Sequence, residues 1–108
     1  MESADIINSV EFDDDMLPFS ITLYNYPNPF NSNTLISFDL IPGDAVKYLR
    51  IYDSLGRLVK EYDGTKITAN FVVWDGYDNN GNSVGAGIYF YLLNTENYTI
   101  SNKMTLIK

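Results

Sequence analysis

The chain has 108 residues, of which 45% are hydrophobic and 15% aromatic, and these values are typical of one globular domain. Its net charge of −7, without a cluster of basic residues, argues against nucleic acid as a partner. Histidine and cysteine are both absent, which excludes disulfides, thiol catalysis and nearly all zinc sites.

The negative charge is concentrated at the N-terminus. Residues 1–18 contain six acidic residues and no lysine or arginine, whereas residues 19–108 carry eight acidic and seven basic residues. We interpret residues 1–18 as an acidic linker, and Asp13-Asp14-Asp15 as a solvated charge run in preference to a calcium cluster. The first 20 residues also lack the basic start and the apolar stretch of a signal peptide. If the protein is exported, we expect its signal peptide to lie upstream of this sequence. No apolar run is long enough for a membrane helix, and we expect no direct membrane insertion.

From Phe19 onward the pattern is one of short strands separated by turn residues. No segment has a convincing helical period, and turn signals recur roughly every 8–12 residues, which is typical of an antiparallel β-sandwich. The sequence therefore predicts an all-β domain over residues 19–108 with about seven strands. The expected strands are Ser20–Asn25, Thr34–Leu40, Val46–Asp53, Arg57–Tyr62, Phe71–Trp74, Ile88–Leu93 and a final strand from Tyr98.

The strands differ in which faces they are expected to bury. In the second, Ile36, Phe38 and Leu40 alternate with polar residues and should face the core. The third leaves the choice of core face open, because tyrosine can serve on either side. Phe71–Trp74 is an almost continuous apolar run, from which we expect burial on much of both faces.

Two turn segments have definite local chemistry. Pro27 and Pro29 fix φ twice and should form a rigid corner that pairs with no strand. Gly56, in the turn after the third strand, is the natural residue for a positive φ. Trp74 is the only tryptophan, and we expect it to anchor the core.

The loop that follows Trp74 offers a weak calcium candidate. Asp75, Asp78 and Asn80 surround glycines, and calcium prefers six to eight oxygen ligands. However, the ligand spacing of a calcium loop is not met, and no glutamate closes the loop. We favour a tight turn in which the Asx side chains cap backbone amides and Gly81 adopts the left-handed conformation.

No other segment suggests chemistry. Asp75 and Asp78 are the only carboxylates close together in a loop outside the acidic arm, and a small sandwich has little concave surface for a substrate. We therefore expect neither enzyme activity nor a cofactor. Tyr89 and Tyr91 share one face of their strand, and we interpret them as packed in the second layer of the sandwich, the alternative being an exposed carbohydrate-stacking strip.

Five sequence blocks, in this order, resemble a known family. They are Tyr26-Pro27-Asn28-Pro29-Phe30-Asn31, Ile51 to Val59, Val73 to Gly81, Gly85 to Tyr91 and Lys103 to Lys108. Over about residues 18–108 they are similar to the type A C-terminal sorting domain of the type IX (Por) secretion system. The pattern is shared with the immunoglobulin-like domain of flagellar hook-capping proteins. The chain departs from many relatives at Asn31-Ser32-Asn33-Thr34, where a second Asn-Pro pair is common.

The resemblance implies an immunoglobulin-like sandwich at the C-terminus of a larger secreted cargo protein. It further implies recognition by the outer-membrane translocon and the cell-surface processing machinery, passage through the periplasm of a Gram-negative bacterium, and a final location at the surface or in the medium. Residues 1–18 would then link the domain to an upstream cargo domain. By position, the residues implied in recognition are Pro27, Pro29, Gly56, Gly87, Tyr89, Tyr91, Lys103, Met104, Leu106 and Lys108.

The final strand, Tyr98–Lys108, is expected to be the recognition edge, because a terminal strand with a free end can pair with a receptor strand. An alternative remains open: a non-catalytic structural or adhesive accessory module of the hook-capping type.

Overall fold

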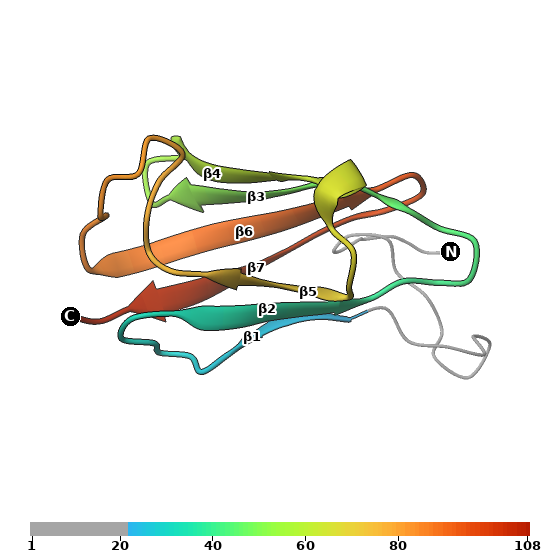
Figure 1. The fold of residues 1–108 in the computed structure, drawn as a ribbon. Coiled ribbons are helices and arrows are strands. Elements are labelled where there is room, and N and C mark those ends of the chain that lie inside the picture. The colour runs from blue at the N-terminus through green and yellow to red at the C-terminus, as the bar shows by residue number, and fades with distance from the viewer. Residues whose placement is uncertain (1–21) are drawn as a thin grey trace, which may run out of the picture.

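Two antiparallel sheets pack face to face in the structure, a computed structural model that describes residues 22–108 (Figure 1). The three-stranded sheet has the order β1 (Thr22–Tyr26), β2 (Thr34–Asp39), β5 (Phe71–Trp74). The four-stranded sheet has the order β4 (Leu58–Asp63), β3 (Val46–Asp53), β6 (Gly87–Thr95), β7 (Thr99–Leu106). The predicted all-β, immunoglobulin-like sandwich of seven strands is confirmed. The proposed acidic linker over residues 1–18 lies outside the described residues.

The core forms from alternate residues of the strands, as the period of two requires. The three-stranded sheet contributes Leu23, Ile36, Phe38 and Trp74, and the four-stranded sheet contributes most of the remaining buried side chains. Those are Leu49, Ile51, Val59, Tyr89, Tyr91, Leu93, Met104 and Leu106. Burial of each side chain of this size contributes about 1.5–3 kcal/mol to the stability of the fold. The apolar side chains packed between the two sheets therefore hold the fold together.

The core face of β3, left open by its sequence, is the one that carries Leu49 and Ile51, both fully buried. On the opposite face the guanidinium of Arg50 lies 3.7 Å from the ring centroid of Tyr48 and pairs with Glu61 at 2.7 Å. Both groups of this ion pair are partly exposed, so the pair contributes little to stability.

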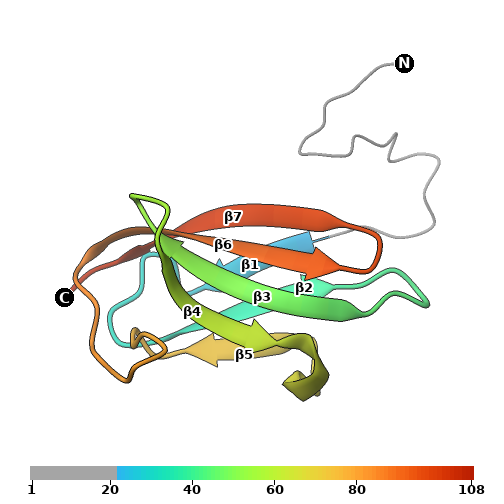
Figure 2. The same cartoon turned by 90° about the horizontal axis from the view of Figure 1, so that it is seen from above.

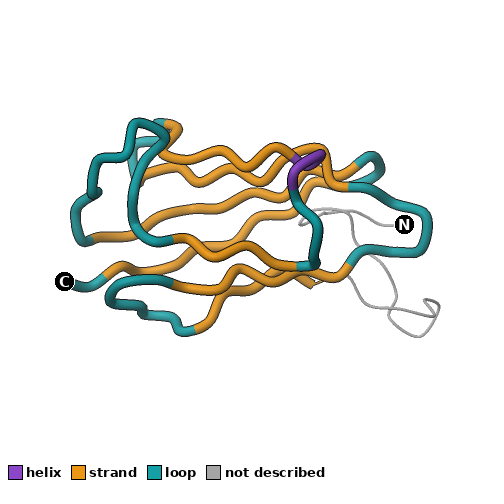
Figure 3. The backbone as a smooth tube through the Cα atoms, viewed as in Figure 1, coloured by secondary structure: helices purple, strands orange, loops and turns teal. Residues whose placement is uncertain are grey.

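The turn between β3 and β4 is organised by Asp53. Its Oδ1 accepts hydrogen bonds from the backbone amides of Leu55 and Arg57, both at 2.9 Å. Gly56 adopts a φ of +84°, as predicted from its place in the turn. Among residues 22–108, the one helical segment is the short turn η2 (Gly64–Lys66) between β4 and β5 (Figure 3), and no helix is long and apolar enough to cross a membrane.

Two expectations about burial were wrong. Phe71 and Val73 are 42% and 51% exposed, because their side chains lie on the outer face of the three-stranded sheet, where Leu35 of the central strand β2 is also 37% exposed. Leu40, expected in the core, lies just beyond the end of β2 and is 36% exposed. Apolar residues in the sequence do not by themselves distinguish a central strand from an edge strand.

The two long sides of the sandwich differ (Figure 2). On one side β1 and β7 approach each other, and the Asn102 Nδ2 group donates a 3.0 Å hydrogen bond to the Leu23 carbonyl. On the other side the edge strands β4 and β5 flank a groove, described below. The sandwich is therefore closed at β1 and β7, and open at β4 and β5.

Candidate functional site

The segment Asn28–Phe30 lies along the outer edge of β7. The Phe30 amide donates to the Thr105 carbonyl at 2.9 Å, and the Ile107 amide donates to the Phe30 carbonyl at 2.8 Å. The Asn28 side chain accepts from the Thr105 amide at 3.1 Å and donates to the Lys103 carbonyl at 3.5 Å. The edge of the last strand is thus occupied from Lys103 to Ile107 and is not open to a receptor strand there, although the final strand was expected to be the recognition edge.

The proline corner also differs from expectation. Pro27 and Pro29 both follow cis peptide bonds, and Phe30 forms an isolated parallel bridge with Leu106. The corner was expected to pair with no strand. Its last residue instead pairs with the final strand, and together with the contact between Asn102 and Leu23 it attaches β7 to the three-stranded sheet.

A buried polar network fixes this corner from within. The Tyr91 hydroxyl donates to Asn25 Oδ1 at 2.9 Å, and Asn25 Nδ2 donates to Thr34 Oγ1 at 3.1 Å and to the Pro27 carbonyl at 3.3 Å. The Thr34 hydroxyl in turn donates to the same carbonyl at 2.9 Å. Every polar atom named here has a partner, which is what a buried network requires to be stabilising.

Sequence reasoning missed Asn25 and Thr34. Thr34 could have been found, because it shares the inward parity of Ile36 and Phe38 and is fully buried. Tyr91 lies in the interior, as the packing interpretation predicted, and its burial raises the pKa of its hydroxyl above the ordinary value. The carbohydrate-stacking alternative for Tyr89 and Tyr91 is excluded by their burial, at 6% and 0% exposed.

An aromatic cluster continues the same interior. The ring of Trp74 lies 5.7 Å from that of Phe30 and 5.3 Å from that of Tyr89, in tilted and edge-on arrangements favoured by aromatic quadrupoles. The Trp74 indole donates to the Tyr77 carbonyl at 2.9 Å, and the Tyr89 hydroxyl donates to the Gly85 carbonyl at 2.6 Å. Trp74 is fully buried, so its predicted role as a core anchor is confirmed.

The residues implied in recognition fall into two groups. Tyr89, Tyr91, Met104 and Leu106 are buried. Exposed positions are Pro27, Pro29, Gly56, Gly87, Lys103 and Lys108. Gly87 has a φ of +152° at the start of β6.

Most of the exposed group gathers at one end of the sandwich. The loops between β1 and β2, β3 and β4, and β5 and β6 lie there beside the C-terminus (Figure 1). At this end the Lys108 ammonium donates to Ser83 Oγ at 2.7 Å, beside a small hollow of about 170 Å³. Lys103 stands apart, on the outer face of β7 opposite Phe90. Lys108 thus places a positive charge at this end of the sandwich.

The loop with the weak calcium candidate has the geometry that the turn interpretation predicts. Asp78 Oδ1 accepts from the amides of Asn80 and Asn82, both at 2.9 Å, and Gly81 has a φ of +84°. Asp75 Oδ1 accepts from the Tyr77 amide at 3.1 Å. Within residues 22–108 no three acidic side chains come together as a metal-binding group. Each carboxylate caps its own turn.

Comparison with solved structures identifies two proteins of Porphyromonas gingivalis with a similar fold. PorZ, described as an essential bacterial surface component of the type IX secretion system, is 23% identical over 80% of this chain, with a TM-score of 0.61. The dimeric latent form of PorU is 22% identical over 85% of the chain, with a TM-score of 0.57. The matched regions are only 11% of PorZ and 10% of PorU. The likeness therefore concerns the fold of one domain within much longer proteins.

No curated protein sequence matches the chain. A family model does match it, over residues 27–97, and these residues include the proline corner, the aromatic cluster and all of β6. That match spans more than half of the 108 residues. The chain belongs to the FlgD Ig-like domain family.

Proposed function

We propose that this domain is a C-terminal sorting module, which directs a larger bacterial cargo protein through the type IX outer-membrane translocon to the cell surface or the medium. The observation that carries the proposal is that two of the sequence blocks, the proline corner and the block that begins β6, both meet β7. The proline corner contacts Thr105 and Ile107 directly, and Tyr91 is hydrogen-bonded to Asn25, which in turn binds Pro27. The fold likeness to a domain of PorZ supports the same proposal at the level of architecture.

The residues of β7 and the C-terminus that are implied in recognition differ in burial, and we propose different roles for the buried and the exposed ones. Met104 and Leu106 are buried and hold β7 against the core, so they act on recognition only by positioning the strand. Lys103 and Lys108 are exposed and present positive charge on the outer face of β7 and at its end. We propose that these two lysines contact the secretion machinery, in a non-catalytic role.

The test is a fusion of the full chain to a reporter that is exported to the periplasm of a type IX-competent bacterium. We expect the reporter at the cell surface or in the medium, and in the periplasm of a strain without the translocon. Deletion of Thr105–Lys108 should block delivery, but it also removes the buried Leu106. The sharper variants are therefore Lys103→Glu and Lys108→Glu, which leave the core intact.

Lys47→Glu, on the exposed surface of β3, is the matched control for the change of charge. The proposal predicts a several-fold loss of delivery for the two β7 variants and normal delivery for this control. Equal delivery with and without the translocon would overturn it.

A second function is favoured by the family match. The FlgD Ig-like domain family supports a structural or adhesive accessory module as the alternative. In the same experiment, a folded fusion that stays in the periplasm of the competent strain would favour this accessory role over sorting.

A further inference from the structure

Loop residues close both edges of the four-stranded sheet. At β7 the edge is taken by Asn28 and Phe30, as described above. At β4, the Asn79 amide donates to the Val59 carbonyl at 3.0 Å, and Asn79 Oδ1 accepts from the Glu61 amide at 3.0 Å. A single asparagine thus imitates a short neighbouring strand. Such covering prevents an edge from pairing with another chain.

The β5 edge of the other sheet differs. The Phe38 amide donates to the Asn70 carbonyl at 3.0 Å, which sets the alternation of the ladder with β2. Phe71 and Val73 therefore direct their backbone groups to the open side of the sandwich. Within residues 22–108, the one partner there is the Tyr62 hydroxyl, which donates to the Val73 carbonyl at 3.3 Å. β5 retains an edge that can accept another strand.

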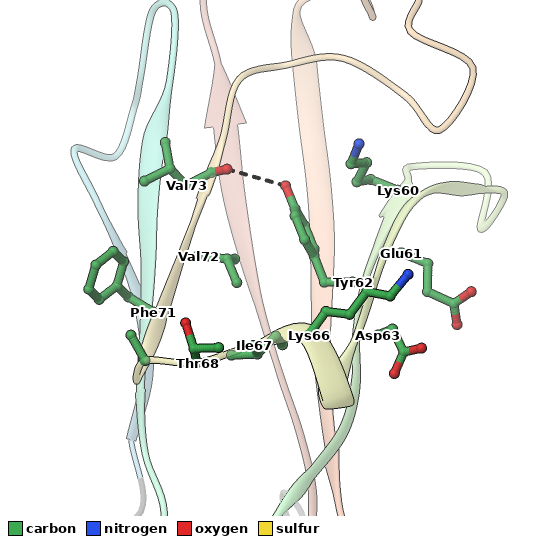
Figure 4. A pocket seen from close by; sticks show the side chains of 11 residues that line it. Lys60, Glu61, Tyr62, Asp63, Lys66, Ile67, Thr68, Phe71, Val72 and Val73 are labelled. Carbon is green, nitrogen blue, oxygen red and sulfur yellow. Dashed lines mark hydrogen bonds between the residues drawn. The ribbon is translucent and has the colours of Figure 1, made fainter.

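A groove of about 450 Å³ lies next to this edge, between β5 and β4. Figure 4 shows Tyr62 reaching across it towards Val73, with Ile67 and Val72 on its walls. The polar and apolar atoms that line the groove suit an extended peptide, whose backbone pairs with an edge while alternate side chains enter the groove.

The unpaired charge at the groove is positive. Glu61 pairs with Arg50 at 2.7 Å, whereas Asp63, whose Oδ1 accepts from the Thr65 amide at 2.9 Å, keeps its charge and attracts Lys66, so one lysine charge at the groove is left in excess. Lys60 and Lys66 also line the groove, and neither forms an ion pair with any residue in the described part of the chain. The groove therefore favours a segment with acidic side chains.

We propose that residues 9–13 of the same chain, Ser-Val-Glu-Phe-Asp, add to the open edge of β5 as a fourth strand of that sheet. Val10 and Phe12 alternate with Glu11 and Asp13, so an extended segment carries apolar side chains on one face and acidic ones on the other. The acidic arm supplies −6 of the net charge without a basic residue.

The two faces match the two sides of β5. Val10 and Phe12 lie beside Phe71 and Val73, which are 42% and 51% exposed on the outer face of the sheet. In the proposed arrangement Glu11 and Asp13 then face the groove, which is lined by Lys60 and Lys66. Docking therefore covers apolar surface and brings opposite charges together at the same time.

The connection is long enough. Thr22 pairs with Asp39 at the end of β2 where Phe38 meets Asn70, so β1 begins at the end of the sheet where β5 begins. A strand added outside β5 lies three strand spacings, or about 14 Å, from the start of β1. The chain from Asp13 to Thr22 spans about 30 Å when extended, which allows docking within one molecule.

The test is paramagnetic broadening in the full chain, and it does not depend on the proposed sorting role. Because the chain has no cysteine, Ser9→Cys provides a single site for a spin label. We expect the amide signals of Phe71 and Val73 to broaden strongly, and that of Lys103, at the opposite edge, to remain sharp. Broadening could come from a spin label on the same chain or from one on a second chain. A mixture of spin-labelled chains with isotope-enriched chains that carry no spin label separates these two sources. Transfer between molecules would assign the edge to a second copy and overturn docking within one chain.

The charge requirement is tested with Lys60→Glu combined with Lys66→Glu, which should reduce the broadening at β5 several-fold. Lys47→Glu combined with Lys103→Glu changes the net charge equally at exposed sites away from the groove and should leave it unchanged. Broadening that is spread evenly over the domain, or that is the same in both double variants, would overturn the proposal.

Discussion

The hydroxyl of Tyr91, on β6, donates a 2.9 Å hydrogen bond to Oδ1 of Asn25, on β1, and joins the two sheets through the interior. Asn25 uses its amide group on Thr34 and the Pro27 carbonyl, so one side chain links the core to the proline corner. The corner that looks like a surface turn in the sequence is therefore held by buried groups on three segments.

Tyr91→Phe removes the donor and leaves Asn25 Oδ1 buried without a partner. An unsatisfied buried acceptor costs about 1–3 kcal/mol, and we expect the free energy of unfolding to fall by that amount. Urea unfolding followed by Trp74 fluorescence measures it. Tyr26→Phe is the control, since Tyr26 is 75% exposed, and it should change stability by less than about 0.5 kcal/mol. Equal stability of the two variants would contradict the role given to this hydrogen bond.

Asn28→Ala removes the side chain that accepts from the Thr105 amide. The last strand should then open more readily, and amide hydrogen exchange at Thr105 should accelerate about five- to tenfold, as expected for the loss of one hydrogen bond. Asn33→Ala, an exposed position in the same loop, serves as the control. Unchanged exchange at Thr105 in the Asn28 variant would show that this contact does not hold the edge.

The hydrogen bonds of the Asp53 carboxylate lead us to expect that the domain loses stability in acid. Hydrogen bonding from the Arg57 backbone amide, aided by the Arg57 guanidinium and the Leu55 amide, lowers the pKa of this carboxyl below its usual range. A lowered folded-state pKa means that its stabilisation is complete above the ordinary value near 4 and is lost as the pH falls through the folded value.

Asp53→Asn should therefore unfold with a shallower dependence on pH below about 5 than the parent chain does, in urea titrations repeated across that range. Glu96→Gln, at an exposed position, controls for the loss of one negative charge. A parent-like slope in the Asp53 variant would contradict this assignment.

The geometry of the loop after Trp74 predicts no response to calcium. Asp78 Oδ1 already accepts two backbone amides, and replacing those bonds by a metal ion would leave the amides without partners. A titration of the full chain with calcium chloride up to the millimolar range should leave its melting temperature unchanged. A rise that disappears in Asp78→Asn would restore the calcium interpretation.

Gly64 and Gly85 provide a matched pair of glycine substitutions. A Cβ at Gly64 would overlap the backbone carbonyl of Val46, whereas a Cβ at Gly85 meets no atom within 4 Å. We expect Gly64→Ala to cost about 1–3 kcal/mol by overpacking, with Gly85→Ala within about 0.5 kcal/mol of the parent. Thermal unfolding of the two variants side by side tests this difference.

Strand positions and the core face of β2 could be predicted because each depends on local alternation, as at Ile36 and Phe38. The exposure of Phe71 and Val73 could not, because it depends on the outer face of their sheet being left uncovered in a sandwich of two sheets. Local sequence carries no information about strand order, which is set by contacts between distant segments.

The candidate site shows the same limit. The turn at Gly56 and the Asx turn at Asp78 follow from nearby residues and were predictable. The occupation of the β7 edge was not, because Asn28 and Thr105 are 77 residues apart in the chain. Only the folded arrangement brings them together.

That separation has a consequence for biogenesis. The proline corner leaves the ribosome among the first parts of the domain, and its partners on β7 are among the last. Until those final residues are synthesised, Phe30 lacks its backbone partners, and the interior cannot close around it. A polypeptide truncated before Thr105 therefore cannot form the contacts between the proline corner and β7, and it lacks the arrangement of loops found at that end of the complete domain.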